Sequence, residues 1–235
     1  MENQIESGAR SIELLRPNHN MTKTCIICQA EANFLYQTKP HSPIYYRCEN
    51  CCCVFEDEHF FIPADEEKKR YDTHNNDVED VRYQNFVSPV VNQVKKYYDQ
   101  KTIGLDFGAG SGPVITKMLN DVGYQLDCYD PYYFPDTYVK ENHFDYIVCC
   151  ETMEHFYHPI DEFKWMKKLL KDGGMFFGKT KMIPNLIDES YFDGFGYKND
   201  PTHVVFYTEK TLQKIKDIIG FSEFFLSDKI IIFKK

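Results

Sequence analysis

The sequence lacks the features that mark several classes of protein. Nowhere do about 18 apolar residues follow one another, so we expect no membrane-spanning helix. The first 20 residues are polar and lack the basic-then-apolar build of a secretory signal peptide. No collagen-like or low-complexity repeat is present. These absences predict a folded, soluble and cytoplasmic protein with no membrane partner.

Basic residues are also scarce and scattered. The chain has 27 Lys and Arg against 36 Asp and Glu, for a net charge of −9. Most of that excess lies in residues 56–80, where ten acidic residues face three basic ones. A nucleic-acid-binding protein needs a clustered basic face to neutralise phosphates. The charge pattern therefore disfavours nucleic acid as a partner, and it predicts an acidic connector in the chain.

The nine cysteines are odd in number, which argues for reduced thiols and metal ligands over a disulfide framework. Two CxxC pairs, separated by 19 residues, match four-cysteine zinc spacing: Cys25, Cys28, Cys48 and Cys51. Cys52 or Cys53 could replace Cys51, although Cys51 repeats the spacing of the first pair. Four cysteine ligands leave no open position for water, so the predicted zinc ion is structural.

From about residue 84, helical and strand patterns alternate, which is typical of an α/β protein with a mostly parallel sheet. Strands are predicted over 102–107, 124–130, 144–150, 175–181, 221–226 and 229–235. Helices are predicted over 84–100, 112–123, 159–172 and 208–220, with a turn at Gly173 and Gly174. Ligands of such sheets bind at the carboxyl ends of the strands.

Polar and glycine residues follow the first three of these strands. The loop 108–112 reads Gly-Ala-Gly-Ser-Gly, Asp130 ends the second strand, and Glu151 follows the third. The GxGxG spacing departs from the GxGxxG of dinucleotide enzymes, and no Lys-Ser or Lys-Thr follows it as in a P-loop. Asp106 precedes the loop by two residues and suits a ligand with an ammonium group. Together these residues favour S-adenosylmethionine as the cofactor.

The ordered motifs LDFGAGSG, CYDPYY, FDYIVCCETMEH and LLKDGGMFF resemble those of class I S-adenosylmethionine-dependent methyltransferases. More narrowly, the chain is similar to a bacterial group with an N-terminal four-cysteine zinc module, a YDxHxN segment and a late KNDPTHV segment, here 71–76 and 198–204. The resemblance implies a Rossmann-like, seven-stranded, mostly parallel sheet with a small N-terminal zinc ribbon. It also implies an enzyme that transfers a methyl group.

The resemblance further implies a set of cofactor-binding residues. They are Tyr71, His74, Asp106, Gly108, Ala109, Gly110, Gly112, Asp130, Pro131, Tyr132, Cys150 and Glu151. Asp130 would bind the ribose, with Pro131 and Tyr132 beside the adenine. The usual third strand, which carries an adenine-binding acid, is not legible in 134–143. Residues 71–76 and the loop 181–203 are candidate lids.

His203, His155 and Glu151 are the candidate catalytic residues. Glu151 follows a central strand and should face the crevice. His203 lies in a loop where polar residues often carry chemistry, and His155 lies near the cofactor face, where it could equally be a core residue. Deprotonation is required only for a hydroxyl or activated-carbon acceptor, and His203, then His155, would be the base.

The sequence is expected to divide into a polar extension 1–20, a zinc ribbon 21–55, an acidic connector and lid 56–84, and a methyltransferase domain 85–235. The predicted activity is methyl transfer to a nucleophilic oxygen, nitrogen or carbon of a small-molecule acceptor. Two alternatives stay open. One is an RNA base methyltransferase whose zinc module holds RNA, and the other is an inactive zinc-ribbon interaction protein.

Overall fold

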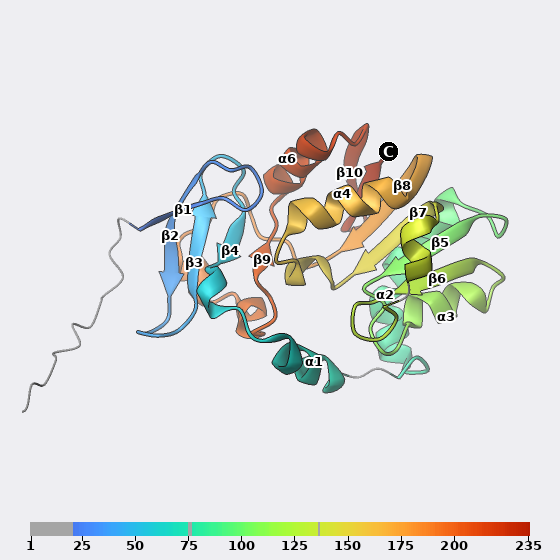
Figure 1. Ribbon diagram of the computed structural model, residues 1–235, viewed down its shortest axis with the longest axis horizontal. Helices are drawn as coiled ribbons and strands as arrows, with labels where there is room; N and C mark the ends of the chain where they lie inside the picture. The colour runs from blue at the N-terminus through green and yellow to red at the C-terminus, as the bar shows by residue number, and fades with distance from the viewer. Residues whose placement is uncertain (1–20, 75–76, 136) are drawn as a thin grey trace, which may run out of the picture.

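The computed structural model describes residues 21–74, 77–135 and 137–235. The expected polar extension 1–20 lies outside these residues, as do Asn75 and Asn76 of the expected lid. Within the described chain there are two sheets, which lie at opposite ends of the molecule (Figure 1). Strand β9, the edge strand of the smaller sheet, lies on the side that faces the larger sheet, and helix α1 lies between the two ends of the molecule.

The smaller sheet is antiparallel and carries the cysteines. Its strands run in the order β1 (Thr22–Thr24), β2 (Glu31–Gln37), β3 (Ile44–Cys48), β4 (Val54–Glu56) and β9 (Val205–Phe206). Strand β9 comes from the far end of the chain, and it pairs Val205 with Phe55 and Phe206 with Val54. The cysteine-bearing sheet is therefore completed by residues that follow the candidate base His203 by only two positions.

The larger sheet has the order β10–β11–β8–β7–β5–β6. Its strands are β5 (Ile103–Phe107), β6 (Gln125–Tyr129), β7 (Phe144–Cys150), β8 (Leu170–Lys179), β10 (Glu223–Ser227) and β11 (Ile230–Lys234). Strands β6, β5, β7 and β8 are parallel, whereas β11 and β10 are antiparallel additions. Chain order reverses around β5, so the crevice between the ends of β5 and β7 is a topological switch point.

Six strands replace the seven that were expected. In the described residues after β6, Asp130 and Phe134 form an isolated bridge, and a short 3₁₀ helix, η2 (Thr137–Glu141), follows. Pro131 and Pro135 interrupt this stretch, and proline cannot donate to a sheet ladder. In the sequence, no strand was legible in 134–143, and the described residues of that stretch, 134–135 and 137–143, form no strand of the larger sheet.

Helices cover both faces of the larger sheet, and strand residues alternate between them. Ile230 and Ile232 pack with α2 (Val81–Tyr97) and α3 (Val114–Asn120). Ile231 and Phe233 pack on the opposite face with α4 (Pro159–Leu169) and α6 (Glu209–Ile219). This period of two is the reason that the strands read as continuous apolar runs in the sequence. The expected doubly covered α/β sheet is confirmed.

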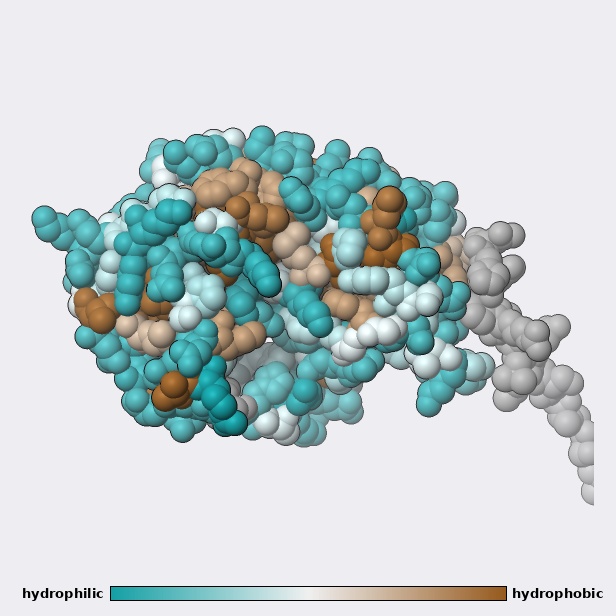
Figure 2. Space-filling model, turned by 180° about the vertical axis from the view of Figure 1, so that it is seen from behind, coloured by the Kyte–Doolittle hydropathy of each residue, from teal (hydrophilic) through white to brown (hydrophobic). Residues whose placement is uncertain are grey.

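The local predictions agree with the elements to within a few residues, with one exception. The expected turn at Gly173 and Gly174 lies inside β8, where Gly173 has a φ of +76°. In the described residues, every helix is too short or too polar to cross a bilayer. The face seen in Figure 2 is largely hydrophilic, and its hydrophobic residues gather in small, separate groups.

Short elements lie at the carboxyl ends of the parallel strands: α1 (Ala64–Asp72), η3 (Met153–His155) and η4 (Gly196–Asn199). Helix α5 (Glu189–Asp193) packs instead on the smaller sheet, where Phe192 contacts Tyr36 and Tyr45, and η1 (Glu58–Phe60) follows β4. The hydrogen bond from the Val204 amide to the Glu154 carbonyl, 2.9 Å long, fastens the segment before β9 to η3. Segments from the connector and from the loop 181–203 thus cover the carboxyl end of the larger sheet.

Candidate active site

A cavity of about 680 Å³ lies at the carboxyl ends of β5, β6 and β7. Every predicted cofactor-binding residue except Asp106 lines it, and so do the three candidate catalytic residues. The lining members of the predicted sets are Tyr71, His74, Gly108, Ala109, Gly110, Gly112, Asp130, Pro131, Tyr132, Cys150, Glu151, His155 and His203. Residues from five segments of the chain therefore converge on one cavity, of the size typical for small-molecule sites.

The glycine loop bends sharply after β5 because two of its residues adopt positive φ. Gly108 has a φ of +77°, and a Cβ there would overlap the Thr152 side chain. Gly110 has a φ of +62°, but the space beside its Cα is open. The amides of Gly108 and Ala109 donate to the Tyr129 carbonyl at 2.8 and 3.1 Å, which holds the loop against β6. The backbone is thus exposed to any ligand in the cavity.

Asp106 lies beneath the loop and is not part of the cavity lining. Its carboxylate is only 4% exposed and accepts a hydrogen bond of 2.9 Å from the Thr116 hydroxyl of α3. Burial raises the pKa of Asp106 to about 6. In this structure the residue joins β5 to α3 below the glycine loop.

Asp130, at the end of β6, organises the opposite wall. Its Oδ2 accepts from the Gly110 amide at 3.0 Å, and its Oδ1 accepts from the amides of Tyr132 and Tyr133 at 2.9 and 3.1 Å. A carboxylate offers about four lone-pair positions. Three are used by the protein, and one on Oδ2 stays available for a ligand hydroxyl.

Helix α1 closes the cavity from the connector side. Glu67, buried on an otherwise exposed helix, accepts hydrogen bonds of 2.6 Å from the hydroxyls of both Tyr71 and Tyr132. Arg70 pairs with Asp200 at 2.7 Å. The Tyr71 ring lies edge-on to His155, with centroids 5.3 Å apart. The connector residues 64–72 therefore form a helix across the cavity, and polar contacts to Tyr132 and Asp200 hold it in place.

Two carboxylates, from the end of β7 and from η3, also line the cavity. Glu151 has a φ of +51°, pairs with Lys179 at 3.0 Å and accepts from the Tyr197 hydroxyl at 2.9 Å. Glu154 is fully buried and also contacts the Tyr197 hydroxyl. Burial, followed by the nearby charge of Glu151, raises the pKa of Glu154 to about 7. Tyr197 thus bridges two acids that would otherwise repel one another.

The two histidines face one another across the same region, with ring centroids 4.8 Å apart. Nδ1 of His155 lies 2.8 Å from the Thr202 carbonyl, and Nδ1 of His203 lies 2.7 Å from the Tyr197 carbonyl. A carbonyl oxygen only accepts, so Nδ1 must carry the proton in both rings. Burial lowers the pKa of each histidine, which favours the neutral form with a lone pair on Nε2.

Sequence reasoning missed several residues of this site. Glu67, Tyr83, Glu162 and Asp200 line the cavity, and Tyr197 and Lys179 bind its carboxylates. Glu67 follows Asp65 and Glu66 in an acidic run, and nothing in that run distinguishes the one acid that is buried. Tyr197 lies in the loop 181–203, which had been noted only as a candidate lid. Glu154 is adjacent to His155 in the sequence, and its pairing with Tyr197 depends on a contact across 43 residues.

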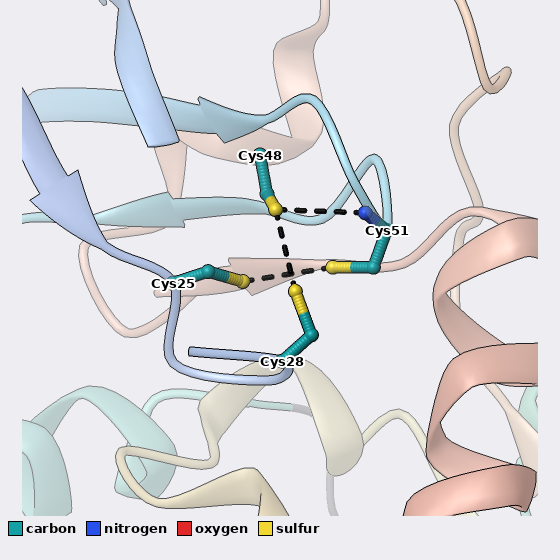
Figure 3. Close-up of side chains that lie close together, drawn as sticks. All are labelled: Cys25, Cys28, Cys48 and Cys51. Carbon is teal, nitrogen blue, oxygen red and sulfur yellow. Dashed lines mark hydrogen bonds between the residues drawn. The ribbon is translucent and has the colours of Figure 1, made fainter. Parts of the chain in front are cut away.

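The four predicted cysteine ligands converge at the end of the smaller sheet, as Figure 3 shows. The Sγ atoms of Cys25 and Cys51 are 3.5 Å apart, and so are those of Cys28 and Cys48. Thiolates bound tetrahedrally at about 2.3 Å stand about 3.8 Å apart, so the donor set fits one zinc ion. Of the three candidates for the fourth position, Cys51 belongs to the cluster.

Comparison with known proteins gives the family of the chain and structures of similar fold. Residues 79–222 match the family model described as a methyltransferase domain. No curated protein matches the chain. One similar structure is that of a 1,6-didemethyltoxoflavin-N1-methyltransferase from Burkholderia thailandensis, solved with 1,6-didemethyltoxoflavin and S-adenosylhomocysteine. Its sequence is 13% identical to this one, the TM-score is 0.53, and the alignment covers 86% of this chain and 98% of that one. A SAM-dependent methyltransferase from Archaeoglobus fulgidus is 15% identical with a TM-score of 0.48, over 65% and 94%.

Proposed function

Because the chain belongs to the methyltransferase-domain family, and is thereby an S-adenosylmethionine-dependent methyltransferase, we propose that it methylates a nucleophilic oxygen, nitrogen or carbon of a small molecule. The observation that carries this proposal is the cavity of about 680 Å³ at the carboxyl ends of β5, β6 and β7. The glycine loop forms one side of it, and a group of carboxylates and imidazoles forms the other. Cofactor and acceptor can therefore meet in one enclosed space.

The cofactor side fits S-adenosylmethionine. The open space beside Gly110 and the exposed backbone of the loop admit a ligand at close range. The lone-pair position left on Asp130 suits a ribose hydroxyl, and Tyr132 lies next to it. Bound there, S-adenosylmethionine would supply a methyl group already activated by a positive sulfur. We propose that the predicted cofactor-binding residues act in these roles.

The protein's own contribution is alignment, exclusion of water and control of a proton. Tyr71 and the rest of α1 cover the cavity, which limits access of water to the reacting atoms. His155 and His203 present unprotonated Nε2 atoms toward it, and either can take a proton from a hydroxyl acceptor. Glu151, held by Lys179, would orient the acceptor by accepting a hydrogen bond.

Charge around the cavity mouth supports a small acceptor over a nucleic acid. Helix α1 bears acidic residues at both ends, including Asp65, Glu66 and Asp72, and its basic side chains are paired with acids. A polyanion approaching this mouth would meet carboxylates where phosphate binding needs cations. An RNA base is therefore the weaker of the two acceptor proposals.

We also propose that the four-cysteine cluster holds a structural zinc ion, and that residues 21–55, 56–84 and 85–235 act as ribbon, connector with lid, and catalytic domain. The ribbon supports the site through β9 and through α6, because the Thr211 hydroxyl donates to the Cys51 carbonyl at 2.9 Å. Loss of the ion would therefore loosen the start of α6 and the segment that carries His203.

Calorimetric titration of the zinc-loaded protein with S-adenosylhomocysteine tests the proposal. We expect one binding site per chain, since the product differs from the cofactor only by the transferred methyl group. The absence of binding to either S-adenosylmethionine or S-adenosylhomocysteine would overturn it. A salt-sensitive gel shift of tRNA or rRNA by the protein would shift the acceptor class to RNA.

A further inference from the structure

Next to the cofactor side of the cavity, three side chains have the composition of a metal site. Glu154, His155 and His203 each offer one ligand atom, and these atoms all lie within 4.8 Å of one another. Ligand atoms about 2.1 Å from a shared ion stand about 3 to 4 Å apart. Small side-chain rotations are therefore enough to bring the three donors onto one ion.

The histidines are already oriented as metal ligands usually are. Each donates its Nδ1 proton to a backbone carbonyl, His155 to Thr202 at 2.8 Å and His203 to Tyr197 at 2.7 Å. Metal-binding histidines characteristically use the second ring nitrogen in this way, because the bond fixes both the tautomer and the ring orientation. The Nε2 lone pairs are left for an ion.

Glu154 supplies an independent observation. The residue is 0% exposed, and Tyr197 contacts its Oε1, yet its Oε2 has no hydrogen-bond partner in the described part of the chain. A buried carboxylate oxygen without a partner is costly. A cation placed between Oε2 and the two Nε2 atoms would remove that cost.

We propose that Glu154, His155 and His203 bind a divalent first-row transition-metal ion that holds an oxygen of the methyl acceptor. Two imidazoles and one carboxylate suit Mn²⁺, Fe²⁺, Co²⁺ or Zn²⁺ better than the all-oxygen sites of Mg²⁺ and Ca²⁺. All three residues line the cavity, so the remaining coordination positions face the acceptor. This inference rests on the proposed function and narrows its acceptor to a molecule with a hydroxyl group.

The ion would change how the acceptor loses its proton. Coordination would lower the pKa of a hydroxyl, so the acceptor would lose its proton to bulk solvent as it binds, before the reacting atoms are shielded from water, and neither histidine would take that proton. The oxygen then forms the new bond to the methyl carbon, while the sulfur–methyl bond of S-adenosylmethionine breaks and its electron pair stays on sulfur. His155 and His203 thus act through the ion when it is bound.

Manganese binding to the zinc-loaded full chain tests the inference, measured from the electron paramagnetic resonance of free Mn²⁺. Thiolate sites prefer zinc over Mn²⁺, so the cysteine cluster does not compete. We expect one Mn²⁺ per chain, and at least about 10-fold weaker binding in Glu154→Gln and His203→Ala. His143→Ala, which lies ahead of β7 at the opposite edge of the sheet, should bind as the wild type does.

Glu154→Gln keeps the shape of the side chain and an acceptor for Tyr197, so it decides the question if His203→Ala fails to fold. The inference is overturned if the wild type binds neither Mn²⁺ nor Co²⁺, or if Glu154→Gln binds the ion as tightly as the wild type. Titration of the same samples with S-adenosylhomocysteine separates the two claims. If the protein binds the cofactor but no ion, only the metal-site inference is refuted. If it binds neither, the proposed function is refuted as well.

Discussion

Replacement of Asp130 by alanine is the most informative perturbation of the cofactor side. The carboxylate accepts three backbone hydrogen bonds, from the amides of Gly110, Tyr132 and Tyr133. Only one of its lone-pair positions stays open to a ligand. The variant therefore removes one bond to the ribose and also loosens the wall against which the glycine loop is held.

The magnitude follows from that count. One hydrogen bond to a charged group contributes about 1.5–3 kcal/mol, and each 1.4 kcal/mol is about tenfold in affinity. We expect Asp130→Ala to weaken S-adenosylhomocysteine binding about 10- to 150-fold. The three freed amides should also lower the free energy of unfolding by about 1–3 kcal/mol, since a partly buried donor loses its acceptor.

Isothermal titration calorimetry measures the affinity, and a thermal melt measures the stability. Asp121→Ala is the matched control, because Asp121 pairs with Lys117 at the exposed end of α3, where its side chain is 58% exposed. The control should leave affinity unchanged. A folded Asp130→Ala variant with wild-type affinity would refute the ribose assignment and the geometry on which it rests.

Three further changes test other parts of the molecule. Burial raises the pKa of Glu56 to about 8, so between about pH 4.5 and 8 the folded protein holds a proton on Glu56 that the unfolded chain has lost, and the stability falls as the pH rises through that window. The Tm of Glu56→Gln relative to the wild type should therefore increase from pH 5 to pH 8, and a constant difference would contradict this. Gly108→Ala should lower the free energy of unfolding by more than about 1 kcal/mol in chemical denaturation, because the new Cβ meets the Thr152 side chain. Gly110→Ala should be less destabilising and should chiefly weaken cofactor binding, because its Cβ enters open space. Equal stability losses in the two variants would count against the loop geometry. Cys51→Ser should lower the zinc content found by elemental analysis and reduce the Tm, and full retention of zinc would move the fourth ligand elsewhere.

The sequence was a good guide wherever the signal was local. Strands β5, β7 and β11 can be recognised from short apolar runs, because a strand that is buried on both faces accepts few polar residues. The glycines after β5 can be recognised in the same way, because positive φ favours glycine. The CxxC spacing likewise predicted the cysteine cluster that the structure contains. The predicted strand-end residues Asp130 and Glu151 lie where the parallel register brings them together.

Contacts between distant segments were beyond such reasoning. Strand β9 has only two residues, too few to show any periodicity, and it exists because β4 offers an edge. Glu67 and Tyr197 are conspicuous only after folding, when each bonds to residues more than 40 positions away. The count of seven strands came from a family resemblance, and the prolines at 131 and 135 accompany its failure in this chain.

Because β4 pairs with β9, the cysteine-bearing module cannot be removed without exposing part of the remaining chain. A chain truncated ahead of α1 would leave Val205 and Phe206 on an unpaired edge, with apolar side chains and open backbone groups that favour aggregation. Exchanging this module between relatives would require β4 and β9 to be exchanged together. The same pairing means that a substitution at Val54 is expected to disturb the packing of its partner Phe206, about 150 residues later in the chain.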